Sequence, residues 1–408
     1  MLDVLERFGA ESDLPRVKVN AGRCLHNINV FATCRVCADE CPVDAIQVAG
    51  AVALDAEACV ECGACAHACP VGAFSAPDLA AALLRTVSRI PDHRAIELAC
   101  AHRATDERSP RPVDAMLVVS GCLAALGPST YAGLYALGVE HIDVCLEACD
   151  ECPANARATI ERTLQKARLD LRPWEAEIDA SAVPAEGPAR PRPVYDIAHP
   201  PVSRKRLFHP LAEAEADRIL ADLLAEDTTA AGRRFPAPER VRLLNALRLL
   251  PPAGQAMCPM PLAGQVFMKH SIEAECSACG ACEKACPTGA LTLDAHDDTG
   301  VFRLIHRASI CAGCRVCIDL CERDVLEQAG VPFFSALQSG AEAVITSGTF
   351  RRCSRCGARI PNGDGKNGLC ELCDFRRKNP FGSRIPERMR ARLENRRARA
   401  VQPPAQSE

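Results

Sequence analysis

Twenty-six cysteines in a chain of 408 residues constrain this protein more than any other sequence feature. They make up about 6% of the residues, several-fold more than an ordinary globular protein carries. Aromatic residues account for only 4% of the chain, so cores filled by aromatic rings are not expected. A chain short of aromatics and rich in thiols predicts that metal ligation replaces part of the hydrophobic core.

The compartment decides whether such cysteines form disulfides or bind metals. The first twenty residues contain no basic segment followed by an apolar run, so no secretory signal is visible. Without export, a disulfide framework is not expected. The near balance of 48 basic and 52 acidic residues excludes a wholesale polyanion binder, and 48% apolar residues exclude a disordered chain. We therefore expect a cytoplasmic metal-binding protein.

Sixteen cysteines form two similar blocks in which a run of thiols is followed, after three intervening residues, by one more. The first block contains Cys24, Cys34, Cys37, Cys41, Cys59, Cys62, Cys65 and Cys69; the second contains Cys276, Cys279, Cys282, Cys286, Cys311, Cys314, Cys317 and Cys321. A Cys-x2-Cys-x2-Cys turn can present three sulfurs to three corners of an iron–sulfur cube, and the partner motif can supply the fourth. Zinc is the competing interpretation, but an evenly spaced run of three thiols suits a cube better.

On these motifs, residues 24–70 and 276–321 each resemble a bacterial-type two-cluster ferredoxin unit. The resemblance implies four 4Fe-4S clusters whose ligands cross between paired motifs. The four implied ligand sets are Cys24, Cys34, Cys37 and Cys69; Cys59, Cys62, Cys65 and Cys41; Cys276, Cys279, Cys282 and Cys321; and Cys311, Cys314, Cys317 and Cys286. The sequence departs from the family at two points. Nine residues separate Cys24 from Cys34, which leaves ligation by Cys24 open, and Glu322 follows Cys321 where proline is usual.

Between the two blocks, strand and helix patterns alternate. Strands are expected at 96–99, 115–120 and 139–144, and helices at 77–90, 130–137 and 155–169. This alternation predicts a small, mostly parallel α/β domain. Residues 115–139 carry no charge and are numerous enough to span a bilayer. Pro128 after Gly127 interrupts the run, so we expect a strand, a turn and a helix there, and no membrane span.

Five further cysteines lie in this segment. Cys100, Cys122 and Cys145 follow the expected strands, and Cys149 and Cys152 lie in the next turn. Because the carboxyl ends of parallel strands meet at one edge of a sheet, these thiols predict a metal or redox site. Two alternatives remain: buried, inert thiols, and a redox-active dithiol made of Cys149 and Cys152.

Residues 119–153 also resemble the small iron–sulfur (delta) subunit of methanogen-type hydrogenases, whose partner is heterodisulfide reductase. The resemblance implies an additional 2Fe-2S cluster within the thiols from Cys100 to Cys152. The pattern of that family is not reproduced residue for residue, so the identity of the ligands stays open.

The last cysteine group, Cys353-x2-Cys356 and Cys370-x2-Cys373, has the spacing of a closed zinc site and looks like a zinc ribbon. A rubredoxin-like iron site is the alternative, since four thiolates accept either metal. The following tail, with Arg384 to Arg399, could bind nucleic acid, although a solvated helix or a docking arm is the simpler interpretation. Cys258 is expected to be structural.

The predicted fold is an α+β multidomain chain with two ferredoxin-like units, a small parallel α/β domain between them and a C-terminal zinc ribbon. Eight prolines between residues 172 and 210 predict a semi-extended linker. The expected domains are 1–76 (two-cluster ferredoxin), 77–171 (α/β), 172–210 (linker), 211–257 (helical), 258–330 (second ferredoxin), 331–375 (zinc ribbon) and 376–408 (basic tail).

The expected function is electron transfer. The sequence lacks a GxGxxG motif after a strand, a P-loop and a haem-attachment motif. Four histidines, His67, His102, His141 and His306, have no metal-pair spacing and are expected at the surface or behind the ligands. We expect an electron-wiring subunit of a cytoplasmic anaerobic oxidoreductase complex of the hydrogenase, formate dehydrogenase or heterodisulfide-reductase-like type. Its partners would be catalytic subunits and a low-potential electron donor or acceptor.

Two alternatives are kept. The first is a redox-sensing regulatory protein that binds nucleic acid through the ribbon and the Arg-rich tail. The second is a self-contained enzyme that uses the thiols from Cys100 to Cys152. The sequence identifies neither the redox partner, nor the direction of electron flow, nor the cluster potentials.

Overall fold

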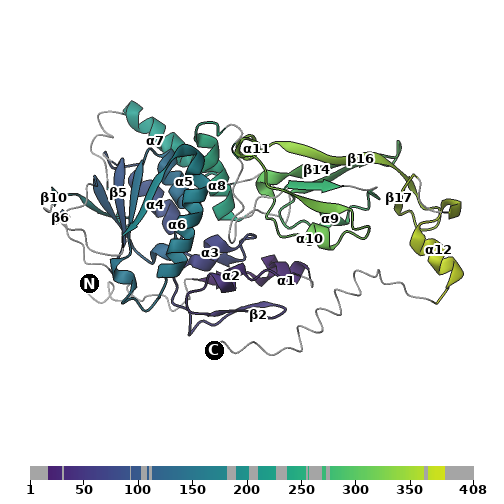
Figure 1. Ribbon diagram of the computed structural model, residues 1–408, viewed down its shortest axis with the longest axis horizontal. Helices are drawn as coiled ribbons and strands as arrows, with labels where there is room; N and C mark the ends of the chain where they lie inside the picture. Colours follow the sequence, from purple (N-terminus) through teal and green to yellow (C-terminus); the bar gives the residue numbers. More distant parts are fainter. Residues whose placement is uncertain are drawn as a thin grey trace, which may run out of the picture.

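The computed structural model describes residues 17–29, 32–91, 93–102, 108–109, 113–181, 190–201, 210–226, 237–253, 256, 269–272, 276–362 and 366–381. Cys258 and the Arg-rich tail from Arg384 to Arg399 lie outside the described residues. Figure 1 shows a sheet with its helices at one end of the molecule and an elongated β arm at the other. The short helices of the first ferredoxin unit lie beneath them.

The first ferredoxin unit consists of short elements between the cysteine loops. They are β1 (Lys18–Val19), α1 (Leu25–Ile28), α2 (Val36–Asp39), β2 (Ile46–Val48), β3 (Val52–Leu54), α3 (Ala64–Ala68) and β4 (Phe74–Ser75). The strands β1 and β4 pair antiparallel, as do β2 and β3. The unit packs around a small apolar core that includes the thiol-bearing Cys37, Cys65 and Cys69.

The second ferredoxin unit repeats this layout. Its elements are β12 (Lys269–Ile272), α9 (Ala281–Ala285), β13 (Leu291–His296), β14 (Val301–Arg307), α10 (Val316–Asp319) and β15 (Leu326–Gly330). The strands β12 and β15 pair antiparallel, as do β13 and β14. The internal repeat in the sequence therefore corresponds to a repeat in strand pairing.

The C-terminal segment continues the sheet of the second unit. The long strand β16 (Glu342–Arg352) pairs first with β14 and then with β17 (Arg359–Pro361), and the helix α12 (Glu371–Lys378) follows. The resulting strand order is β13-β14-β16-β17. The boundary predicted at residue 330 thus does not separate two sheets, because pairing between β14 and β16 crosses it.

The middle of the chain forms the expected parallel sheet. Its five strands are β5 (Ala95–Cys100), β7 (Ala115–Val119), β8 (His141–Cys145), β9 (Glu177–Ser181) and β11 (Val194–Asp196), in the order β11-β7-β5-β8-β9. The helices α4 (Leu79–Val87), α5 (Pro128–Ala136) and α6 (Arg157–Leu171) share one buried core with one face of this sheet (Figure 1). Within the described residues, no helix combines the length and apolarity needed to cross a bilayer.

The prediction of a linker over residues 172–210 was wrong for part of the segment. The strands β9 and β11 come from it and form the two edges of the parallel sheet. A short strand pair, β6 (Arg108–Ser109) with β10 (Arg190–Pro191), forms just before β11. Prolines are tolerated next to edge strands, where one side of the backbone needs no ladder hydrogen bonds. Arg192 anchors the returning chain through a buried ion pair with Glu97.

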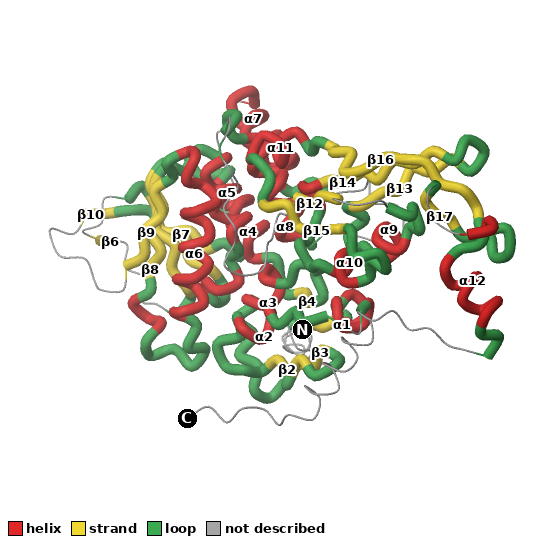
Figure 2. The backbone as a smooth tube through the Cα atoms, turned by 45° about the vertical axis from the view of Figure 1, so that its right-hand side comes forward, coloured by secondary structure: helices red, strands yellow, loops and turns green. Residues whose placement is uncertain are grey.

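Three further helices lie outside the ferredoxin units and the parallel sheet with its own helices. They are α7 (Pro210–Leu223), α8 (Pro238–Leu249) and α11 (Phe334–Ser339). In Figure 1 and Figure 2, α8 lies between the helices of the parallel sheet and the second ferredoxin unit. Glu239 on α8 accepts hydrogen bonds from the backbone N–H (2.7 Å) and the hydroxyl (2.6 Å) of Ser129, at the start of α5. The first unit is attached by Glu40, which pairs with Arg162 and Lys166 on α6 at 3.0 and 3.4 Å.

Candidate metal centres

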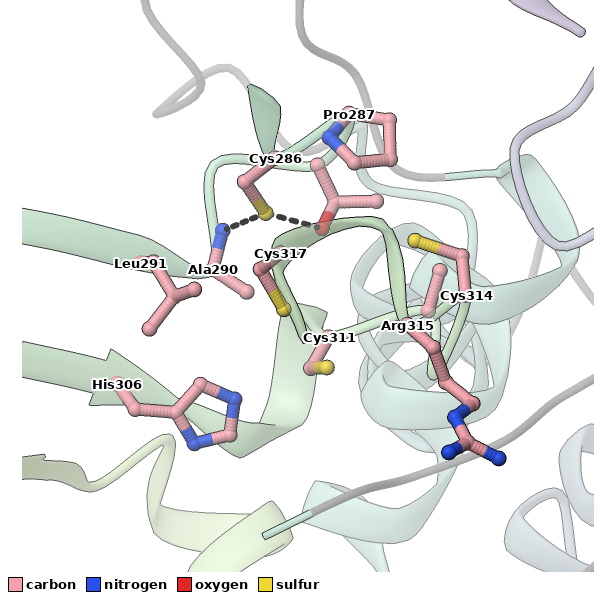
Figure 3. A pocket seen from close by; sticks show the side chains of 11 residues that line it. Cys286, Pro287, Ala290, Leu291, His306, Cys311, Cys314, Arg315 and Cys317 are labelled. Atoms are coloured by element: carbon pink, nitrogen blue, oxygen red, sulfur yellow. Dashed lines mark hydrogen bonds between the residues drawn. The ribbon is translucent and has the colours of Figure 1, made fainter. Parts of the chain in front are cut away.

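The fourth predicted ligand set lines a single cavity. Cys311, Cys314 and Cys317 lie in the loop and first turn of α10, and Cys286 follows α9. Figure 3 shows these four side chains around the same space, with the buried His306 beside them. The fold therefore brings the Cys-Pro thiol of one motif to the three-thiol loop of the other.

Two more of the predicted sets behave in the same way. One cavity is lined by all four thiols of the third set, Cys276, Cys279, Cys282 and Cys321. Another is lined by all four of the second set, Cys41, Cys59, Cys62 and Cys65. In each case the fourth thiol comes from the partner motif. Cys279 is exposed, so the third set lies nearest to solvent at that residue.

The first set is brought together in spite of its displaced member. Burial raises the pKa of Cys37 to about 12, and the neighbouring thiols Cys69, Cys34 and Cys24 raise it further. His26 holds the long loop closed, because its Nε2 donates to the carbonyl of Cys34 at 2.7 Å. Cys24 therefore lies near the other thiols of the set in spite of the nine-residue spacing. No motif in the sequence points to His26, because its partner is a backbone carbonyl.

Backbone hydrogen bonds to sulfur follow the Cys-Pro motifs. The amides of Ala45, Ala73 and Ala290 donate to the sulfurs of Cys41, Cys69 and Cys286, four residues earlier, at 3.3, 3.2 and 3.2 Å. Such bonds stabilise a negatively charged sulfur. Among the described residues, the sulfur of Cys321 receives no corresponding bond, and this is the motif in which Glu322 replaces proline.

Burial favours the protonated form of several of these thiols when no metal is bound. It is the main cause that raises the pKa of Cys282 and Cys314 to about 12, and adjacent thiols add to it. It also raises the pKa of Cys65 and Cys317. Since a metal binds the thiolate, loading of these sites releases protons.

The C-terminal thiols are arranged differently. The sulfurs of Cys353, Cys356, Cys370 and Cys373 all lie within 4.8 Å of one another, and those of Cys356 and Cys370 are 3.7 Å apart. A tetrahedral ion with metal–sulfur bonds of about 2.3 Å places its ligand sulfurs about 3.8 Å apart. These four thiols therefore fit a single ion. In the described part of the chain no other group of potential ligands is so compact, which agrees with larger clusters at the ferredoxin sets.

One thiol of this group is prepared for binding. The backbone N–H of Cys370 donates to the sulfur of Cys353 at 3.3 Å and is the main cause that lowers the pKa of Cys353 to about 6. This hydrogen bond favours the thiolate form of Cys353, which is the form that binds a cation.

Cys100 and Cys145 end the strands β5 and β8, and Cys122 follows β7, so these three thiols lie at the carboxyl edge of the sheet. Cys100 and Cys149 belong to the core on the helix-covered face, and the half-buried Cys122 and Cys152 pack against it. Cys145 packs instead with Ala99 and Met116, in the core of the opposite face. Side chains alternate between the faces of a strand, so Cys100 and Cys145 end their strands pointing in opposite directions. The four thiols other than Cys145 form the better candidate ligand set.

This edge lies directly against the second ligand set. Burial raises the pKa of Cys122 to about 12, and among the thiols near it is Cys62 of the second set. The buried His67, two residues after Cys65, donates to the carbonyl of Ala124 at 3.0 Å. The amide of Ala124 in turn lies 3.5 Å from the sulfur of Cys122. His67 was expected at the surface or behind the ligands, and its burial at this contact supports the latter.

Gly63 makes this contact close, and its replacement tests the contact. A Cβ at residue 63 would lie 2.9 Å from the Cβ of Ala125, in a backbone with φ of +78°. We expect Gly63→Ala to release iron from the second set faster by roughly tenfold, because overpacking costs about 1–3 kcal/mol. The rate at which iron passes from the protein to a chelator measures this release.

Gly50→Ala is the matched control, since φ is +83° there and no atom lies within 4 Å of the added Cβ. Both variants carry the backbone penalty of about 1–2 kcal/mol, but only Gly63→Ala crowds Ala125. Equal release rates in the two variants would contradict the close contact.

Comparison with known families agrees with the cysteine geometry. Residues 275–325 match the family described as 4Fe-4S dicluster domain, and residues 52–75 match the 4Fe-4S binding domain. The chain contains 4Fe-4S ferredoxin-type domains. The second match covers Cys59 to Cys69 and begins after Cys41. A search of curated proteins found no match.

Proposed function

We propose that this chain is an electron-transfer protein with four 4Fe-4S clusters, one in each crossed ligand set. The observation that carries the proposal is that three cavities are each lined by four thiols drawn from two paired motifs. When bound, such clusters supply one-electron transfer. The residues of this chain would hold the clusters, bury half of the sixteen thiols and donate backbone hydrogen bonds to sulfur.

The packing of the ligand sets supports one continuous relay. Burial, with a contribution from Cys282 of the third set, raises the pKa of Cys317 in the fourth. Ala312 and Cys314 of the fourth set pack in the core of the first ferredoxin unit. Within that unit, Cys37 of the first set lies near Cys65 of the second. The order runs from the third set, through the fourth, into the first unit, and ends at the α/β edge.

We assign a fifth centre to that edge. Cys100, Cys122, Cys149 and Cys152 share one core and supply the four thiols that a 2Fe-2S cluster requires. Cys145 is left out because it packs on the other face of the sheet. At the C-terminus, the compact thiol group is assigned to one zinc ion, which would hold the loops of Cys353 and Cys370 together.

A relay with two ends implies two partners. The exposed Cys279 marks one end, and the α/β edge marks the other. We propose that the chain is an electron-wiring subunit of an oxidoreductase complex of the hydrogenase, formate dehydrogenase or heterodisulfide-reductase-like type. The resemblance of residues 119–153 to the hydrogenase delta subunit supports this class of partner.

Anaerobic purification followed by metal analysis and reduction tests the proposal. We expect about 16 iron per chain from the ferredoxin units, about 18 with the fifth centre, and one zinc. Dithionite should reduce the clusters and produce electron paramagnetic resonance signals. Iron-loaded protein without any reducible cluster signal would refute electron transfer, and chains that co-purify would identify the complex.

A further inference from the structure

A buried arginine from the α/β side of the molecule reaches the loop of the fourth ligand set. Arg240 lies in the first turn of α8 and its side chain is fully buried. Its Nε donates to the carbonyl of Ser309 at 2.9 Å, and its Nη2 lies 3.4 Å from the carbonyl of Ala308. Nη2 also donates to the carbonyl of Cys311. The guanidinium therefore bonds the backbone on both sides of the turn that presents Cys311.

This arrangement does two things at once. The three carbonyls belong to the short 3-10 turn Ala308–Ile310 and to Cys311 itself, so the hydrogen bonds fix the position of one ligand of the fourth set. The guanidinium also places a permanent positive charge in a buried region, where charges are poorly screened. Cluster reduction adds one negative charge, and a nearby cation stabilises the reduced form relative to the oxidised form.

We propose that Arg240 is a positioning residue that raises the reduction potential of the fourth cluster. The inference rests on the proposed function, because it requires a cluster at Cys286, Cys311, Cys314 and Cys317. His306 and Arg315 also line this cavity, but both lie within the second unit. Arg240 comes from α8, so the potential of the fourth cluster depends on how the second unit docks against the rest of the chain.

Arg240→Gln tests the charge in the full-length, iron-loaded protein. We expect the ratio of reduced to oxidised fourth cluster, at the wild-type midpoint, to fall about tenfold, which equals about 59 mV for one electron. Redox titration monitored by electron paramagnetic resonance measures this ratio and the midpoint potential. The step that belongs to the fourth cluster is the one that disappears in Cys314→Ala.

Two further variants separate charge from structure. Arg240→Lys keeps the charge but not the fork of donors. We expect its ratio of reduced to oxidised fourth cluster, at the wild-type midpoint, to stay within threefold of the wild-type ratio. Arg242 lies on the same helix, but its guanidinium pairs with Asp78. We expect Arg242→Gln to leave the midpoint potential of the fourth cluster unchanged. A tenfold fall in Arg240→Lys would overturn the proposal, and so would an unchanged midpoint in Arg240→Gln.

The outcomes also separate this inference from the proposed function. Wild-type protein without reducible clusters refutes the function itself. Four reducible clusters with no effect of Arg240→Gln refute only the role of Arg240. If Arg240→Gln loses its fourth cluster, the Arg240→Lys variant decides the role of the charge. An unshifted midpoint potential in Arg240→Lys supports that role, and a shifted midpoint contradicts it.

Discussion

Replacing Cys41 with alanine should remove about four iron per chain from the second ligand set and leave the first set loaded. Cys41 lies in the first motif of the sequence, next to Cys34 and Cys37, but it lines the cavity of Cys59, Cys62 and Cys65. The expected loss is large because a cubane that lacks one of its four thiolate ligands has one iron without a protein ligand. Iron analysis of the anaerobically purified variant measures the loss.

Double variants make the test sharper. Cys41→Ala with Cys65→Ala affects one set and should cost about four iron, whereas Cys41→Ala with Cys37→Ala affects two sets and should cost about eight. If each sequence motif held its own cluster, the two results would be exchanged. Cys145→Ala is the control, since this thiol lies outside the four sets and on the opposite sheet face from the fifth candidate site.

Replacing Cys370 with serine should release one metal ion and unfold the C-terminal segment beyond β16. A metal ion held by the four thiols would join the two loops, and structural zinc contributes about 10–16 kcal/mol of apparent binding free energy in small zinc-binding domains. Limited proteolysis should then cut this segment while the ferredoxin units stay intact. Metal analysis measures the lost ion and also decides between zinc and a rubredoxin-like iron.

Ser354→Ala is the matched control for the C-terminal site. The hydroxyl of Ser354 donates to the carbonyl of Gly368 at 3.3 Å in the same pair of loops, but it is no ligand. We expect this variant to keep its metal and to resist proteolysis as the wild type does. Loss of the metal without loss of protease resistance in Cys370→Ser would show that the segment folds without the site.

The parallel sheet and its helices could be predicted from the sequence because their apolar patterns are local. The strands that precede Cys100, Cys122 and Cys145 were expected from short apolar runs, and the structure confirms them. The edge strands β9 and β11 were missed because the prolines around them dominate the local pattern. Their place in the sheet depends on pairing with β8 and β7, which lie far away in the sequence.

The boundaries around the second ferredoxin unit were also beyond local reasoning. The pairing of β14 with β16 joins that unit to the C-terminal segment, and Phe334 of α11 packs edge-on against Trp174, with ring centroids 5.3 Å apart. Neither contact leaves a signal in a short window of sequence, because each requires two segments whose separation is set by the fold.

The motifs of the two ferredoxin-type units could be found in the amino-acid sequence alone. Thiol spacing within a turn is a local property, so Cys-x2-Cys repeats are enough to predict cluster or zinc ligands. The fold, in contrast, sets which thiols share a cavity and which sheet face each strand-end thiol occupies. It also sets which distant side chain, such as Arg240, reaches a ligand loop. These features depend on long-range packing, in which residues far apart in the chain become neighbours.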